Sequence, residues 1–263
     1  FTTDMDRLLA ERDQFQPVTT PELFARLWLG SMPGLISGQS PDRNIFYSSY
    51  LSTYVERDVR ELSGSVDALK FNRFVTAVAA RCSQLLNYKA LADDADIDMP
   101  TAKNWVNILE TLGIIFLLHP YSNNVLKRTI KTPKVYFYDT GLVCYLTRWS
   151  SPEVAESGAM SGALLENFAV SEIMKSYQNA GLEPYLYFYR DRDAKEIDVI
   201  LEGDGKLCPL EIKKTATPDK RLTRVFSVMD RSPLQLGTGA VLCMAEQFGA
   251  FDRDNLIVPI WMI

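Results

Sequence analysis

Two acidic residues and a lysine in the last third of the chain have the types and spacing of a metal-dependent hydrolytic site. Asp198 lies in the apolar run EIDVILE (196–202), and after 12 intervening residues Glu211 and Lys213 lie in CPLEIKK (208–214). Alternate residues of a strand share a face, so Glu211 and Lys213 would point to one side. Carboxylates on neighbouring strands can bind Mg²⁺, and a lysine beside them can orient water or stabilise charge on a phosphate. The pattern predicts a divalent-cation site at which an attacking water and a phosphate group could be held.

A further carboxylate, Glu166, would extend this acidic cluster from a preceding helix. The segment 162–177, GALLENFAVSEIMKSY, has the apolar periodicity of an amphipathic helix and carries Glu166 near its start. Alternatively, Asp198, Glu211 and Lys213 could form a solvated face on an edge strand, as charged residues on strands usually do. The active-site interpretation is favoured because each charge is embedded in an apolar run.

The segments around these charges predict a sheet flanked by helices. Five strand-like runs are expected at 185–190, 196–202, 208–214, 239–244 and 256–263. The turn 191–195 would join the first two as a hairpin. A second helix is expected near 222–229, between the third and fourth strands.

Residues 70–121 have the order of elements that is typical of a winged helix-turn-helix. Three helices and a strand are expected at 71–82, 88–97, 101–115 and 114–118. Residues 123–134 would then form the wing, and VYFYD (135–139) would be the returning strand.

The predicted wing region is basic, whereas the presumed recognition helix is not. Residues 120–148 carry five cations against Asp139 alone: Lys127, Arg128, Lys131, Lys134 and Arg148. The recognition helix offers Lys103 as its one cation, and four aspartates between residues 93 and 98 would repel phosphate. We expect the wing cations and Lys103 to contact a nucleic-acid backbone without reading bases. Winged helices also dock proteins, which is the alternative interpretation.

The N-terminal part reads as helical over residues 20–62, with a loop rich in Gly, Pro and Ser at 30–42. Its second half places an apolar stripe on one helix face, formed by Tyr47, Tyr50, Leu51, Tyr54, Val55 and Leu62. We expect this stripe to pack in the core. Self-association through it, which would give a homo-oligomer, is the alternative.

Composition excludes several other chemistries. The 263 residues contain one histidine, His119, and four separated cysteines, so HExxH proteases and zinc ribbons are ruled out. The net charge of −5, from 28 basic and 33 acidic residues, argues against a protein whose whole surface coats nucleic acid. No apolar run reaches membrane-spanning length and no signal peptide opens the chain. We therefore expect a soluble cytoplasmic protein that does not bind membranes.

The ordered motifs of the chain resemble a known family. LLENFAV, YFYRDRDAKEIDVIL and PLEIKK resemble the restriction-endonuclease-like domain, the PD-(D/E)xK nuclease fold. YLSTYVERDVREL, the winged-helix stretch, KTPKVYFYDTGL and the nuclease-like strands together resemble the domain of unknown function numbered 4143, from about Tyr47 to Lys214. That family forms the C-terminal part of bacterial and archaeal AAA-type P-loop ATPases. The chain departs from it where the proline–aspartate of many such nucleases is replaced by Ile197-Asp198.

The resemblance implies that Asp198, Glu211 and Lys213 are the nuclease-type motif and that Glu166 is its helical acid. It also implies a preceding ATPase domain, which would bind ATP and be a partner of this region. The 263 residues contain no GxxxxGK[ST] loop and begin at Phe1. We therefore expect that the ATPase part has been removed from a longer protein.

The expected architecture is α+β / α/β in three parts. A helical linker or collar (1–69) precedes a winged helix-turn-helix (70–148), and a restriction-endonuclease-like mixed sheet flanked by helices follows (149–263). The expected function is nucleic-acid binding with Mg²⁺-dependent endonuclease activity. The alternative is a noncatalytic regulatory module that recognises a protein partner or DNA while the ATPase performs the work.

Overall fold

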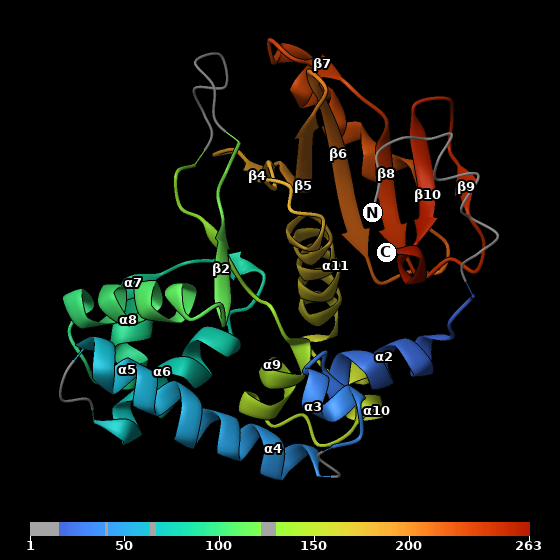
Figure 1. Cartoon of the computed structure of the whole chain (residues 1–263). Helices are drawn as coiled ribbons and strands as arrows, with labels where there is room; N and C mark the ends of the chain where they lie inside the picture. Colours follow the sequence, from blue (N-terminus) through green and yellow to red (C-terminus); the bar gives the residue numbers. More distant parts are fainter. Residues whose placement is uncertain (1–15, 40–41, 64–66, 122–129) are drawn as a thin grey trace. The chain divides into compact units, whose positions relative to one another are not determined.

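The structure, a computed structural model, describes residues 16–39, 42–63, 67–121 and 130–263 (Figure 1). The chain divides into two compact units, each built from segments that are not continuous in sequence. The helical unit takes its described residues from 24–117 and 134–167, and the sheet unit takes them from 1–23, 118–133 and 168–263. Both boundaries expected from the sequence, after residues 69 and 148, lie inside the helical unit.

A series of short helices opens the described chain. They are α2 (Thr20–Leu29), α3 (Pro33–Ile36), α4 (Arg43–Ser49), the π-helix η2 (Tyr50–Val55) and α5 (Glu56–Ser63). Helix α3 lies inside the segment expected to be a loop, so that prediction is correct only in part. Tyr47 is completely buried, as expected for the tyrosine stripe. The side chains of Tyr54, Val55 and Leu62 lie outside the described residues.

Three further helices confirm the predicted helical run between residues 68 and 111. They are α6 (Ala68–Ala79), α7 (Tyr88–Ala95) and α8 (Met99–Thr111). Each begins after a side chain that accepts backbone N–H groups of its first turn, namely Asp67, Asn87 and Asp98. Phe71 and Phe74 pack edge-on against Trp105, with ring centroids 5.3 Å apart in both pairs.

A small sheet with the order β1-β3-β2 accompanies these helices. Its strands are β1 (Gln84–Leu85), β2 (Ile115–Leu118) and β3 (Lys134–Phe137). Residues 122–129, most of the expected wing, lie outside the described residues. Three helices follow β3: α9 (Thr140–Leu146), α10 (Pro152–Ser157) and α11 (Ser161–Asn179). Helix α11 starts in the helical unit, and from Phe168 onward it belongs to the sheet unit.

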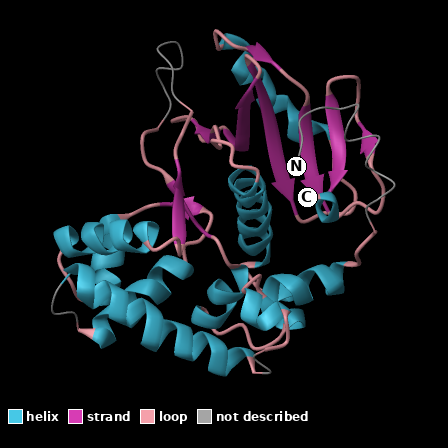
Figure 2. Ribbon diagram, viewed as in Figure 1, coloured by secondary structure: helices cyan, strands magenta, loops and turns pink. Residues whose placement is uncertain are grey.

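The sheet unit is built on a mixed sheet with the order β4-β5-β6-β8-β10-β9 (Figure 2). Its strands are β4 (Leu186–Arg190), β5 (Glu196–Gly203), β6 (Lys206–Lys213), β7 (Gln235–Leu236), β8 (Gly239–Cys243), β9 (Gly249–Ala250) and β10 (Asn255–Pro259). Strands β4, β5 and β6 run antiparallel in turn, whereas β8 is parallel to both β6 and β10. Strand β7 pairs with β6 outside this order. The predicted hairpin and mixed strand arrangement are therefore confirmed.

The helix expected near 222–229 is present as the 3₁₀-helix η3 (Lys220–Arg231). Phe226 and Met229 of η3 join a buried cluster with Ile197, Ile200 and Leu207. The last strand ends earlier than predicted, because β10 stops at Pro259 and the 3₁₀-helix η4 (Ile260–Met262) follows. Proline has no N–H with which to continue a ladder.

The four cysteines are free and buried. Among the helices in the described part of the chain, none has the length and apolar character needed to cross a membrane.

Candidate functional site

Strands β5 and β6 bring the two predicted carboxylates side by side (Figure 1). Val199 pairs with Leu210 in the antiparallel register, and the same register continued by one residue sets Asp198 opposite Glu211. The backbone N–H of Ile212 donates to Asp198 Oδ2 at 2.8 Å, which fixes this carboxylate against β6. The structure therefore joins two carboxylates that are separated by 12 residues in the sequence into one acidic pair.

Lys213 completes the cluster, on the face of β6 that it shares with Glu211. Its Nζ lies 2.7 Å from Glu211 Oε1 and 3.7 Å from Asp198 Oδ2. The lysine side chain is 43% exposed, whereas the side chains of Asp198 and Glu211 are 8% and 10% exposed. The cluster is thus open to water at the ammonium group and closed around the carboxylates.

The burial of these carboxylates excludes the solvated edge-strand interpretation. β5 lies between β4 and β6, and β6 lies between β5 and β8, so neither is an edge strand. The consecutive residues 197–201 of β5 and 207–212 of β6 are all buried, which means that both faces of the sheet are covered here. Burying a charge costs several kcal/mol unless it is compensated. Two carboxylates beside one ammonium group leave a net negative charge at this position.

The donor set fits a Mg²⁺ ion. This cation is usually held by one or two carboxylates, with water and substrate phosphate oxygens completing its shell. Asp198 and Glu211 supply two such groups from adjacent strands, and the side of the cluster that is open to water is the one occupied by Lys213. Among the described residues, no group of three or more His, Cys, Asp or Glu side chains could hold a metal ion. A cation here would therefore have to take its remaining ligands from water and phosphate.

Glu166, the third predicted acid, has a different environment. It lies in the helical unit, where its Oε1 accepts hydrogen bonds from Lys134 Nζ at 2.9 Å and from Tyr136 Oη at 2.6 Å. Asp198, Glu211 and Lys213 belong to the sheet unit. The structure thus gives Glu166 two partners within its own unit, and its role in the metal-binding and catalytic set stays a prediction.

Lys134, predicted to contact nucleic acid, also needs correction. Its side chain is only 3% exposed and forms the ion pair with Glu166. β3 is buried along its whole length, so a lysine there must find an internal partner. A buried, paired ammonium group is not available to a phosphate backbone.

The other basic residues that were predicted to contact nucleic acid have different environments. Lys127 and Arg128 lie outside the described residues, while Lys131 is exposed. Lys103 is exposed on α8, and its Nζ lies 5.6 Å from the centroid of the Tyr88 ring. Three of the aspartates expected to repel phosphate form ion pairs: Asp93 with Lys89, Asp94 with Arg81 and Asp96 with Lys70. The fourth, Asp98, caps α8. Their negative charge is therefore partly balanced by local structure.

Two family models together match most of the chain. Residues 20–153 match the model described as "Domain of unknown function (DUF8612)". The chain belongs to this DUF8612 family. Residues 161–263 match the model described as "Domain of unknown function (DUF4143)". The resemblance to DUF4143 is thus supported, but its extent is corrected: it covers the segment from α11 to the C-terminus, not residues 47–214.

Relatives of this DUF8612 chain occur in mycobacteria. The uncharacterized proteins Rv2008c of Mycobacterium tuberculosis and Mb2031c of Mycobacterium bovis are each 29% identical to it over 238 residues. These alignments cover 89% of this chain and 52% of each relative, so the chain spans about half the length of these proteins. No solved structure matches the chain.

One set of functional candidates in this DUF8612 chain was not visible as a motif. Asp139, Tyr47 and Ser31 meet at the start of α9, where Asp139 accepts from the Tyr47 hydroxyl at 2.7 Å and from the Ser31 N–H at 2.6 Å. Asp139 also caps α9 through the N–H of Leu142 at 2.6 Å. The YDTGL stretch is a sequence signal for this helix start, but the partners lie about 100 residues earlier and cannot be read from spacing.

Proposed function

We propose that this chain is the C-terminal part of a AAA-type ATPase and that it binds nucleic acid and hydrolyses phosphodiesters with Mg²⁺. The observation that carries the hydrolytic proposal is the pair of buried carboxylates, Asp198 and Glu211, with Lys213 Nζ within 4 Å of both. The strand order around this pair is compatible with a restriction-endonuclease-like domain. The helices α6, α7 and α8 with strands β1, β2 and β3 are likewise compatible with a winged helix. The greater length of the mycobacterial relatives is compatible with a further domain in the whole protein.

The proposed chemistry assigns one task to each side chain. Asp198 and Glu211 would hold the cation, which when bound supplies positive charge to the phosphate oxygens. Lys213, exposed on the water side of the pair, would donate a hydrogen bond to a non-bridging phosphate oxygen and stabilise its charge in the transition state. A water oxygen bonds to phosphorus as the ester bond to the leaving sugar oxygen breaks. Water releases one proton and the leaving oxygen takes one, so no redox partner is needed.

Nicking of supercoiled plasmid DNA in Mg²⁺ or Mn²⁺ tests this proposal. Asp198→Asn and Glu211→Gln remove one charge each from the pair with little change in shape, and we expect both to reduce the nicking rate at least 100-fold. Asp204→Asn is the matched control, because Asp204 is exposed at the turn of the same β5–β6 hairpin. Its left-handed backbone (φ 51°) also suits asparagine.

Calorimetric titration with Mn²⁺ gives a second readout that does not depend on a substrate. We expect the wild type and Asp204→Asn to bind the ion and Asp198→Asn to bind none. Equal nicking by the wild type and Asp198→Asn, or no Mn²⁺ binding that depends on Asp198, would overturn the catalytic proposal. That result would support the noncatalytic regulatory role instead.

A further inference from the structure

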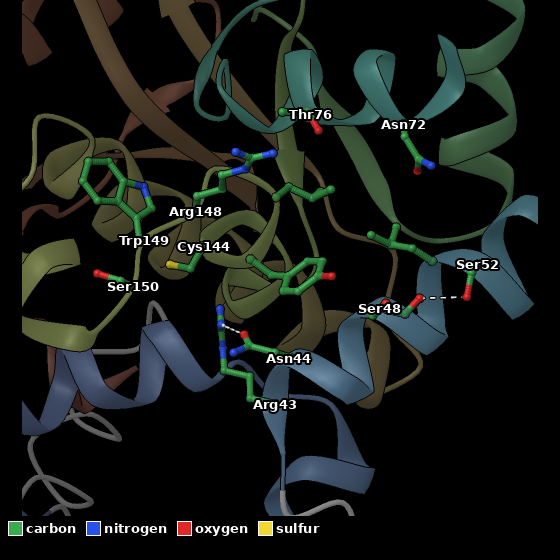
Figure 3. Close-up of a pocket in the computed structure, with 13 residues that line it drawn as sticks. Arg43, Asn44, Ser48, Ser52, Asn72, Thr76, Cys144, Arg148, Trp149 and Ser150 are labelled. Carbon is green, nitrogen blue, oxygen red and sulfur yellow. Dashed lines mark hydrogen bonds between the residues drawn. The ribbon is translucent and has the colours of Figure 1, made fainter. Parts of the chain in front are cut away.

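Two adjoining hollows in the helical unit form one groove rich in arginine. Their volumes are about 580 and 590 Å³, and they share Asn72, Thr76 and Arg148 in their walls. Figure 3 shows the first hollow, whose lining side chains come from α4 and η2, from α6, and from residues 144–150. We call the two hollows together the arginine groove.

The arginine groove is positively charged in a chain whose net charge is −5. Four arginines line it: Arg43, Arg73, Arg81 and Arg148. Among the described residues in its walls, Asp94 is the one acidic residue, and it pairs with Arg81 at 2.6 Å. The other three arginines form no ion pair with the described carboxylates. The walls therefore have a net charge of about +3 and attract anions.

Arg43 is held rigidly at one wall of the groove. Its Nε donates to the carbonyl oxygen of Trp28 at 2.7 Å, and its Nη2 donates to that of Gly141 at 2.8 Å. The guanidinium carbon lies 4.1 Å from the centroid of the Trp28 ring. These contacts fix the position of a positive charge, and because the residue is only 7% exposed, Arg43 adds to the positive potential at this wall but is not a free donor.

Arg148 occupies a backbone position that normally belongs to glycine. It is the first residue after the C-cap of α9, with φ 61°. Its N–H donates to the Tyr145 carbonyl at 3.2 Å, and the Trp149 N–H donates to the Cys144 carbonyl at 2.9 Å, which is the Schellman pattern of a helix end. A left-handed conformation costs a non-glycine residue about 1–2 kcal/mol. The arginine at this position bears that local cost, and its side chain extends toward α6 (Figure 3).

The groove walls also carry polar side chains of the types that contact phosphate and sugar in nucleic-acid complexes, beside apolar residues such as Leu51 and Leu146. Hydroxyl groups come from Ser48, Ser52, Thr76 and Ser150, and amide groups come from Asn44 and Asn72. The cations are also spread along the groove. Arg73 lies on α6, Arg81 follows the C-terminal end of that helix, and Arg148 follows the C-terminal end of α9. This distribution suits a chain of phosphates better than one small anion.

We propose that the arginine groove binds the sugar–phosphate backbone of a nucleic acid without reading its sequence. The inference rests on the nucleic-acid binding proposed above and assigns that binding to a surface of the helical unit. It does not require the carboxylate pair on β5 and β6 to be catalytic.

The test is the salt dependence of binding to a fluorescent DNA duplex of about two helical turns in EDTA. Arg73→Gln/Arg148→Gln removes two groove cations, and the removal of each phosphate-binding cation should lower the slope of log K against log salt by about 0.9. We expect a slope smaller by about 1.8 and binding weaker on the order of 50-fold at about 0.1 M KCl. Arg26→Gln/Lys89→Gln is the matched control, because it makes the same charge change at exposed residues outside the groove walls.

Two further variants separate charge from folding. Arg73→Lys/Arg148→Lys keeps both charges and should keep the wild-type slope of log K against log salt. Arg148→Gly should have a melting temperature no lower than that of the wild type and should still bind the duplex more weakly. The proposal is overturned if the wild type does not bind duplex at about 0.05 M KCl, if the groove variant keeps the wild-type slope, or if the control is weakened as much. Binding of inorganic phosphate by calorimetry without duplex binding would also overturn it. Because EDTA prevents metal-dependent cleavage, a negative result in this binding assay and a negative result in the nicking assay are independent of each other.

Discussion

The hydroxyl group of Tyr47 should contribute measurably to the stability of the helical unit. It lies 2.7 Å from Asp139 Oδ1 and 3.0 Å from the carbonyl oxygen of Leu29, in a fully buried position. Tyr47→Phe removes one hydrogen bond to a charged acceptor, which is worth about 1.5–3 kcal/mol. In the variant, Asp139 still accepts hydrogen bonds from the N–H groups of Ser31 and Leu142. We therefore expect the free energy of unfolding to fall by an amount near the lower end of this range, about 2 kcal/mol.

The size of this loss should depend on pH in a defined direction. Burial, and then the charge of Asp139, raises the pKa of Tyr47 well above its ordinary value near 10. Above about pH 10 the unfolded chain therefore releases the phenol proton while the folded chain keeps it. The stability that Tyr47 contributes is complete below about pH 10 and declines as the pH rises further. At about pH 10.5 the decline is about 0.8 kcal/mol, so the difference between wild type and variant should shrink from about 2 to about 1.2 kcal/mol.

Urea unfolding followed by tryptophan fluorescence measures both quantities, since Trp28, Trp105 and Trp149 all lie in the helical unit. Tyr185→Phe makes the same chemical change at an exposed tyrosine, and we expect it to be neutral at about pH 8. A Tyr47→Phe cost below about 0.5 kcal/mol would contradict the hydrogen-bonded arrangement. A cost of about 2 kcal/mol that is the same at about pH 8 and about pH 10.5 would contradict the raised pKa.

Two further predictions concern other buried groups. Lys134→Met takes the buried ammonium group away from the Glu166 carboxylate, so we expect a loss of about 3–5 kcal/mol in urea unfolding. Lys134→Met/Glu166→Gln should recover at least half of that loss, and a neutral single variant would refute the burial of this pair. The four cysteines should resist an aromatic disulfide reagent at about pH 8 until the chain is unfolded, because all are buried and burial raises the pKa of Cys144 to about 12. Rapid reaction of any thiol in the folded protein would be inconsistent with this.

The elements of the fold were predictable where a single segment carries its own signal. The helices α6, α7, α8 and α11 and the strands β4, β5, β6 and β8 each show apolar periodicity and end signals within a few residues. Segments without such signals were misjudged. Helix α3 is a single turn inside a loop-like composition, and the last strand, expected to run to residue 263, ends at Pro259. Division into compact units was also not predictable, because each unit combines distant segments.

For the candidate site too, the sequence predicts contacts between consecutive strands but not contacts between distant segments. Asp198, Glu211 and Lys213 could be joined from sequence because they lie on consecutive strands, where alternation and register are short-range rules. Glu166 has the same chemical type and also lies in an apolar run, yet its partners are Lys134 and Tyr136, about 30 residues earlier.

What separates the two environments is how the charge is balanced. In the helical unit, the Glu166 carboxylate is 17% exposed and accepts hydrogen bonds from one buried ammonium group and one phenol. On β5 and β6, two buried carboxylates share one half-exposed lysine, and the resulting negative charge favours a cation. The arginine groove instead has an excess of positive charge. Three of its four arginines form no ion pair with the described carboxylates. Sequence alone could indicate the carboxylate pair but not the arginine groove, whose four cations are spread from residue 43 to residue 148.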